Sequence, residues 1–188
     1  MPSTPFPTLT SKRLILREIT QTDIQQIFEI YSDTEAMRWF GTNPIQSSEQ
    51  AQSIIELFAN WRIQANSGTR WGIQLKGEDH LIGTCGLFRW DTNWKKCSVG
   101  YELASSAWGN GYMFEALNTI IPWGFTEMML NRIEALIHPK NVQSLRLIEY
   151  LSFRNVGLLR EAGYWSNQHH DLLQYGLLLS DWNTTKQH

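Results

Sequence analysis

The sequence predicts a mixed α/β fold, with one sheet and flanking helices in a single domain spanning residues 1–188. Segments with the helical spacing of apolar residues alternate along the chain with segments in which apolar and polar residues alternate, as in strands. The predicted order is a strand, two helices, a three-strand meander, a helix, a strand, a helix and two closing strands. A chain of 188 residues has room for one substantial core and barely for two.

The first predicted strand covers residues 12–18, and two helices follow it. Each helix is expected to begin with a capping box, in which a Ser or Thr is followed three residues later by Gln. The two boxes are Thr22 with Gln25 and Ser47 with Gln50. Apolar residues then recur at helical spacing: Ile24, Ile27, Phe28 and Tyr31 in the first helix, and Ala51, Ile54, Phe58, Trp61 and Ala65 in the second, which should end near residues 67–68.

The middle of the chain is predicted to form a meander of strands over residues 70–76, 80–90 and 95–104, with Gly77 in the first turn. In the third strand, alternation places Tyr101 on one face and Glu102 on the other. A helix is expected from Gly111, a strand over residues 132–138, and a short helix capped by Asn141. Residues 153–159 and 171–179 complete the expected sheet.

Composition argues against several classes of protein. The net charge is −2, and no cluster of Lys and Arg indicates a nucleic-acid partner. No apolar run reaches the roughly 18 residues that a membrane span requires, and the first nine residues show no signal peptide. Cys85 and Cys97 lack the spacing of a zinc site or a disulfide framework, so we expect no metal and a cytoplasmic protein.

The segment from Val99 to Leu117 is the most informative, because a strand leads through Gly109 and Gly111 directly into a helix. Glycines allow a tight turn and a close approach to a ligand, and the free N–H groups at a helix start attract phosphate oxygens. A tight turn without a ligand is the alternative. Phe114 occupies the third small position of a dinucleotide fingerprint, and the Gly-Lys-Ser/Thr of a P-loop does not occur.

Four ordered pieces of the chain resemble the GNAT superfamily of N-acetyltransferases. Residues 101–116 read Tyr-Glu-Leu…Trp-Gly-x-Gly-Tyr…Glu-Ala, which is similar to the acyl-CoA signature of the Rim-type ribosomal-protein N-terminal acetyltransferases. Residues 139–157 resemble the family's Asn-x-x-Ser…Leu-Gly-Phe…Gly pattern, and residues 10–17 and 82–87 resemble its first and third strands. The resemblance covers nearly the whole chain.

The resemblance implies a GNAT-like domain: a mostly antiparallel sheet of six to seven strands, about four helices, and a pair of strands that splay apart where residues 132–138 leave their neighbour. It implies acetyl-CoA as the cosubstrate. The amides of the loop would bind the CoA diphosphate, and strand backbone would pair with the pantetheine arm, which Asn141 would also touch. The expected cofactor-binding residues are Leu103, Ala104, Ser105, Trp108, Gly109, Asn110, Gly111, Tyr112, Met113, Asn141 and Ser144.

The implied reaction is direct transfer to a neutral primary amine, with a backbone N–H stabilising the oxyanion and a proton supplied to the leaving thiolate. Glu102 is the favoured base, acting through water, and a solvated strand residue is its alternative role; Ser144 would lie near the thiolate. An N-cap role for Ser144 is an equal alternative. Weaker candidates for the base are Glu134, Glu161 and His138, whereas Glu115 is expected to stabilise its helix end.

The chain departs from the family at the position of a common catalytic tyrosine, which is Ile148 here, and Tyr150 should point elsewhere. Ser152 also replaces a usual glycine. A non-catalytic acyl-CoA-binding or sensor module is therefore an alternative, as is a nucleotide-binding enzyme. The expected partner is a primary amine, either a protein N-terminus or a small amine, and the protein is expected to be a monomer or homodimer that contacts neither nucleic acid nor membrane. Trp39 and Phe40 lie in a region that lines the acceptor pocket in the resembling family, and surface packing is an equal alternative for them.

Overall fold

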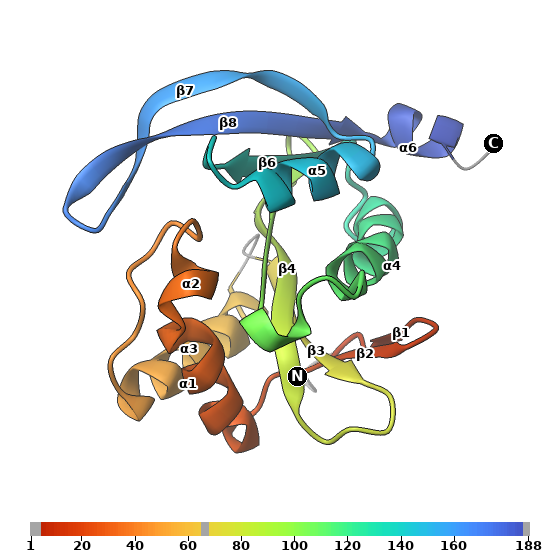
Figure 1. The fold of residues 1–188 in the computed structure, drawn as a ribbon. Helices are drawn as coiled ribbons and strands as arrows, with labels where there is room; N and C mark the ends of the chain where they lie inside the picture. Colours follow the sequence, from red (N-terminus) through yellow and green to blue (C-terminus); the bar gives the residue numbers. More distant parts are fainter. Residues whose placement is uncertain (1–4, 65–67, 186–188) are drawn as a thin grey trace.

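The computed structural model describes residues 5–64 and 68–185, and its strands form one eight-stranded sheet (Figure 1). The strand order is β1-β2-β3-β4-β5-β6-β8-β7. All neighbouring strands are antiparallel except β5 and β6. The strands are β1 (Leu9–Thr10), β2 (Leu14–Arg17), β3 (Gly68–Leu75), β4 (Leu81–Asp91), β5 (Lys96–Leu103), β6 (Arg132–Ile137), β7 (Arg154–Trp165) and β8 (Gln168–Leu178).

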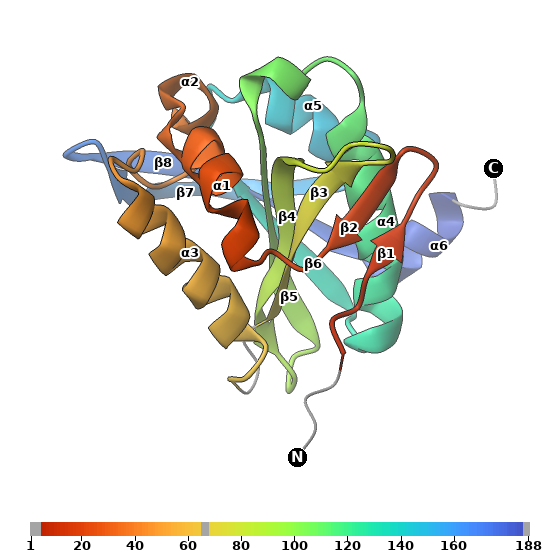
Figure 2. The same ribbon diagram turned by 90° about the horizontal axis from the view of Figure 1, so that it is seen from below.

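Helices lie on both faces of the sheet (Figure 2). They are α1 (Ile24–Ser32), α2 (Thr34–Met37), α3 (Ser48–Trp61), α4 (Tyr112–Glu127), α5 (Val142–Tyr150) and α6 (Leu179–Thr185), with 3₁₀ turns η1 (Gln21–Asp23) and η2 (Ser105–Ala107). Buried apolar residues form two clusters. One includes Ile27 of α1 and Ile55 and Phe58 of α3. The other, larger cluster includes Leu117 and Ile121 of α4.

The mixed α/β fold and its mostly antiparallel sheet are confirmed, whereas the expected counts of elements were too low. Among the described residues the sheet has eight strands rather than six to seven, and there are six α-helices rather than four. Strand β1 has two residues and helix α2 has four, which is too short for a periodic pattern to reveal. The closing hairpin is longer than predicted, because β7 continues to Trp165 through an irregular register.

Two of the three predicted helix caps need correction. The first box uses Thr20 and Asp23 instead of Thr22 and Gln25: the Thr20 N–H donates to Asp23 Oδ2 at 2.8 Å. Ser47 is the N-cap of α3, but Gln50 accepts a hydrogen bond from the N–H of Gln46. Asn141 caps α5 as predicted. The second helix, α3, ends at Trp61, earlier than the predicted end near residues 67–68, and Ala65 lies outside the described residues.

Strands β5 and β6 splay apart as predicted. Their parallel ladder comprises three residue pairs and ends at Ser98 with Glu134. Beyond that point β5 continues to Leu103 along β4, and β6 continues to Ile137 along β8. The sheet therefore opens between the two strands, and α4 and α5 stand at this opening on one face (Figures 1 and 2). No helix in the described part of the chain is long and apolar enough to cross a bilayer.

Candidate active site

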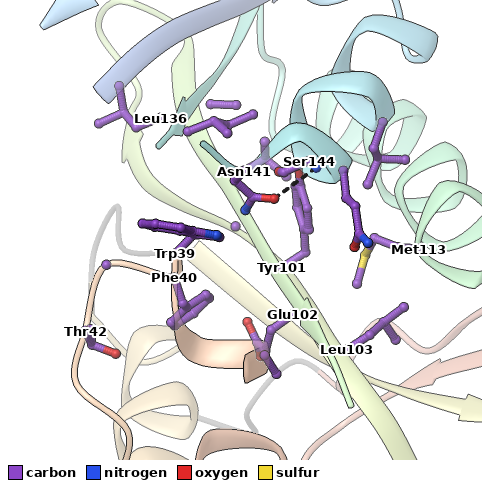
Figure 3. Close-up of a pocket in the computed structure, with 18 of the residues that line it drawn as sticks. Trp39, Phe40, Thr42, Tyr101, Glu102, Leu103, Met113, Leu136, Asn141 and Ser144 are labelled. Atoms are coloured by element: carbon purple, nitrogen blue, oxygen red, sulfur yellow. Dashed lines mark hydrogen bonds between the residues drawn. The ribbon is translucent and has the colours of Figure 1, made fainter. Parts of the chain in front are cut away.

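A cleft of about 1080 Å³ passes through the opening between β5 and β6. On one side of the sheet it is lined by residues of α1, α3 and the segment between them, including Trp39 and Phe40. On the other side it reaches the start of α4 and the start of α5, including Gly111 and Ser144 (Figure 3). A molecule that enters the cleft from one face of the sheet could thus contact a second molecule that enters from the opposite face.

The loop before α4 adopts the conformation that its glycines predict. Gly109 and Gly111 have φ values of 77° and 73°, in the left-handed region that glycine tolerates best. The first intrahelical bond runs from the Glu115 N–H to the Gly111 carbonyl at 3.1 Å. The N–H groups of the residues between them therefore have no partner within the helix and point out of its positive end. This geometry suits a phosphate group.

Side chains hold this loop in place. The Trp108 Nε1–H donates to the Leu103 carbonyl at 3.0 Å, and the Asn110 side chain donates to the Trp108 carbonyl at 2.9 Å. Gly109 and Gly111 line the cleft, whereas Asn110 does not, because its amide is folded back onto the loop. The loop is thus preorganised by contacts that leave its outward face free for a ligand.

Arg13, which the sequence pattern did not single out, also joins the loop. Its guanidinium donates to the Asn110 carbonyl at 3.0 Å and forms an ion pair with Glu115 at 2.7 Å. The Glu115 carboxylate also accepts from the Ser11 hydroxyl and from the Arg13 backbone N–H, each at 2.7 Å. Although burial opposes it, these donors together lower the pKa of Glu115. Glu115 therefore has the structural role expected of it, and Arg13 adds a cation beside the loop.

Strand β5 presents an open backbone edge to the cleft. Its residues after Ser98 pair with β4 on one side and, among the described residues, with no strand on the other. An extended chain could hydrogen-bond to this edge as an added strand does. Leu103 lines the cleft there, whereas Ala104 and Ser105 do not. Ser105 instead hydrogen-bonds to Asp33 and, against the effect of burial, lowers the pKa of that carboxyl.

Tyr101 and Ser144 form a hydroxyl pair on the face of β5 that meets α5. Their oxygens are 2.6 Å apart, and both residues line the cleft (Figure 3). The Asn141 side chain accepts from the Ser144 N–H at 3.1 Å, so the N-cap fixes the position of the serine. Burial raises the pKa of Tyr101 even though the Ser144 hydrogen bond lowers it. Sequence reasoning assigned Tyr101 to this face by alternation but gave it no chemical role.

Glu102 lies on the opposite face of β5, in a buried polar network that lines the cleft. Its carboxylate accepts from Arg70, Tyr31 and Thr84, and it forms an ion pair with Arg70. Burial would lower the pKa of Arg70, but the Glu102 carboxylate more than offsets this and raises it. Burial raises the pKa of the Tyr31 hydroxyl. Arg70, Tyr31 and Thr84 come from distant segments, and no local pattern could have paired them with Glu102.

The weaker candidates lie apart from the cleft. Glu134 forms ion pairs with Arg132 at 2.8 Å and Lys96 at 3.8 Å. Glu161 is exposed on β7. His138 is buried, with its ring stacked on Trp39 at a centroid distance of 4.1 Å. Burial and the nearby His170 and Lys140 lower the pKa of His138. Glu134 and His138 are thus engaged elsewhere in the fold, and Glu161 is exposed outside the cleft.

The departures from the family pattern have clear positions. Ile148 is fully buried, and Tyr150 is 80% exposed, so neither can place a hydroxyl in the cleft. Ser152 has a φ of 66°, a conformation that glycine adopts at lower cost. Within residues 5–64 and 68–185, no group of three or more His, Cys, Asp or Glu side chains could hold a metal ion. The polar groups that line the cleft are hydroxyls, the carboxylates of Glu35 and Glu102, cationic side chains and backbone amides.

Residues 13–154 match the acetyltransferase (GNAT) domain family, and the chain belongs to this family of N-acetyltransferases, which use acetyl-CoA. A relative in Bacillus subtilis, the N-acetyltransferase YoaA, is 35% identical over 173 residues, 92% of this chain and 97% of the relative. The resemblance to the GNAT superfamily and the function as an acetyl-CoA-dependent enzyme that acetylates an amine are thereby confirmed.

Solved structures confirm the fold. The spermidine N-acetyltransferase of Vibrio cholerae, in complex with CoA and spermine, has a TM-score of 0.79 at 20% identity, covering 92% of this chain and 99% of the other. An acetyltransferase of Salmonella typhimurium that modifies the N-terminal serine of ribosomal protein L7/L12 has a TM-score of 0.80 at 16% identity, covering 90% and 96%. At these identities the similarity establishes the shared fold.

Proposed function

We propose that the cleft holds acetyl-CoA on the α4 side of the sheet and a primary amine on the α1–α3 side. The opening between β5 and β6 carries this proposal, because it connects the two sides where β5 has an open edge. The N–H groups between Gly109 and Met113 would bind the diphosphate, and Arg13 would add positive charge beside them. The β5 edge near Leu103 would pair with the pantetheine arm, close to Asn141.

Two neighbouring residues of β5 would act as the proton acceptor and the proton donor of the reaction. Glu102 faces the amine side, and we assign it the role of proton acceptor, directly or through a water molecule. Tyr101 faces the CoA side, and its hydroxyl, paired with that of Ser144, would donate to the leaving thiolate. Because burial raises the pKa of Tyr101, this hydroxyl is protonated at neutral pH and can donate. Tyr101 thus supplies the proton-donating hydroxyl that the side chain of Ile148 lacks.

The easiest acceptor for this site is an α-amine. An α-amine has a pKa of about 8, whereas a lysine-type alkylamine has a pKa of about 10.4 and is almost wholly protonated at pH 7. The structural relatives that act on a ribosomal N-terminal serine and on spermidine represent these two kinds of amine. A cytoplasmic location is proposed from the two cysteines, Cys85 and Cys97, which are free, buried thiols.

Replacing Glu102 with Gln tests the assignment of the proton acceptor. Glu102→Gln should lower kcat/KM about 100-fold for an alkylamine, the scale of a lost general base, and distinctly less for an α-amine that is already partly neutral. Release of free CoA thiol from acetyl-CoA measures both rates. A purely structural loss would lower the two rates equally, and that result would remove Glu102 from the mechanism.

A stability control accompanies this variant, because it leaves the buried Arg70 without its partner charge. Thermal unfolding of the variant with saturating acetyl-CoA should show a single folded population at the assay temperature.

If the unchanged protein binds acetyl-CoA but releases no thiol with any amine in a broad panel, the chain is a binding or sensor module instead of an enzyme.

A further inference from the structure

We propose that the acceptor is a primary amine that carries a bulky apolar group and a single positive charge, and that polyamines are poor acceptors. The inference rests on the proposed function, since it concerns the amine side of the same cleft. We call this region the acceptor chamber. Its walls are Phe40, Ile54, Leu57, Phe58, Trp61 and Phe88, from α3, β4 and the segment after α2, and Glu102 lies at its inner end (Figure 3).

The walls of the acceptor chamber are apolar and partly open to solvent. Phe40, Ile54, Trp61 and Phe88 are half-buried, and Leu57 is 50% exposed. Large apolar side chains at the surface of a cleft gain free energy when an apolar ligand covers them. The chamber therefore favours an amine whose neighbouring atoms are carbon, not a second ammonium group.

The charges in the cleft do not favour a polycation. Among the described residues, the charged side chains that line the cleft are Glu35, Arg70, Arg89, Glu102 and Lys140, an excess of positive charge. Glu102 forms an ion pair with Arg70, which balances its charge. Glu35 remains as an exposed carboxylate, while Arg89 and Lys140 add two cations. A polyamine would bring several positive charges into a site with no surplus of carboxylates.

Aromatic rings can also bind cations, but arginine side chains already lie over several rings of the chamber. Arg70 lies over Phe40 and Phe58, with its guanidinium carbon 5.8 Å and 5.3 Å from the two ring centroids. Arg89 lies 5.8 Å from the Phe88 ring centroid, and Trp61 stacks on the same ring at 5.4 Å. A second ammonium group would compete with these guanidinium groups for ring faces that they already contact.

The test compares amines of matched chemistry on the complete chain. Phenylalaninamide and 2-phenylethylamine present an aromatic group on an α-amine and an alkylamine, respectively, and spermidine presents a polycation. We expect kcat/KM to be at least about 10-fold higher for each aromatic amine than for spermidine, the scale of discrimination that apolar pockets provide. Equal or faster turnover of spermidine would overturn the inference while leaving the proposed function intact.

A matched pair of variants locates the preference in the acceptor chamber. Leu57 and Ile63 are both exposed apolar residues, at 50% and 82% exposure, but only Leu57 lines the cleft. Leu57→Glu should shift the ratio of kcat/KM values toward spermidine about 10-fold, because it adds a carboxylate to an apolar wall. Ile63→Glu should leave the ratio unchanged.

Two failures can be told apart by also measuring acetyl-CoA binding. If acetyl-CoA binds and the two variants give the same ratio, the acceptor chamber does not select the amine, and the further inference fails alone. If acetyl-CoA itself does not bind to the unchanged protein, the proposed function fails as well. In the Leu57→Glu variant, acetyl-CoA affinity should match that of the unchanged protein, since the substitution lies on the amine side of the sheet.

Discussion

At the scale of single residues, alternation along β5 predicted which face each side chain would take but not what it would meet there. Glu102 and Tyr101 lie on opposite faces, as their positions require. Arg70, by contrast, is paired with Glu102 across 32 positions of sequence, and Tyr31 across 71. Such partners depend on the order of β3, β4 and β5 in the sheet and on the packing of α1 against β4, so the network around Glu102 could not be predicted from local patterns.

Tyr101→Phe tests the assignment of the proton donor at this scale. The substitution removes one hydroxyl and keeps the ring, so kcat should fall about 100-fold while the affinity for acetyl-CoA changes little. The matched control is Tyr150→Phe, because Tyr150 is 80% exposed on α5. Initial rates of thiol release measure both variants. Unchanged turnover in Tyr101→Phe would mean that the thiolate leaves without help from this pair.

At the scale of elements, the most accurate predictions came from segments with a long run of regularly spaced apolar residues or with a distinctive turn. The start of α4 was placed correctly because the residue types at Gly109 and Gly111 fit the left-handed φ values that the turn requires. The contacts that Glu115 makes with the turn after β1, which we call the clamp, were not predictable, since Ser11 and Glu115 are 104 positions apart. A helix end is thus visible in sequence, whereas its tertiary anchor is not.

Glu115→Gln tests the clamp. Because the folded state lowers the pKa of Glu115, the carboxylate contributes stability at pH values above its unfolded pKa of about 4.3, and that contribution is lost as the pH falls. At pH 7 the variant should lose about 2 kcal/mol of unfolding free energy, as expected for charged hydrogen bonds. As the pH falls from about 4.3 through the lower folded-state pKa of Glu115, this difference should shrink, and below the folded-state pKa the two proteins should converge.

Denaturant unfolding across this pH range measures the difference. Glu127→Gln, at the other end of α4, is the control and should behave like the unchanged protein, since Glu127 is exposed. A loss of stability that is the same at pH 7 and at about pH 2 would show that the Glu115 carboxylate is not the group that titrates.

At the scale of the whole molecule, one arrangement gives the fold its function: two strands that begin as neighbours separate, and the helices on either face leave the gap accessible. The order of elements could be predicted from the sequence. The separation of β5 from β6 was predicted from the family resemblance. The composition of the acceptor chamber could not be predicted, because Phe40, Leu57 and Phe88 converge from three separate segments. Substrate choice thus depends on tertiary structure more than any other property of this chain.

Calorimetric titration of acetyl-CoA into Gly111→Val and Gly77→Val tests most directly the claim that the loop before α4 binds the diphosphate. Both glycines have positive φ values, 73° and 89°, and both have room for a side chain, so the backbone strain is comparable. Only Gly111 lies in the loop before α4. We predict that Gly111→Val weakens acetyl-CoA binding at least about 10-fold, or about 1.4 kcal/mol, and that Gly77→Val binds like the unchanged protein. Equal affinity in both variants would contradict the account.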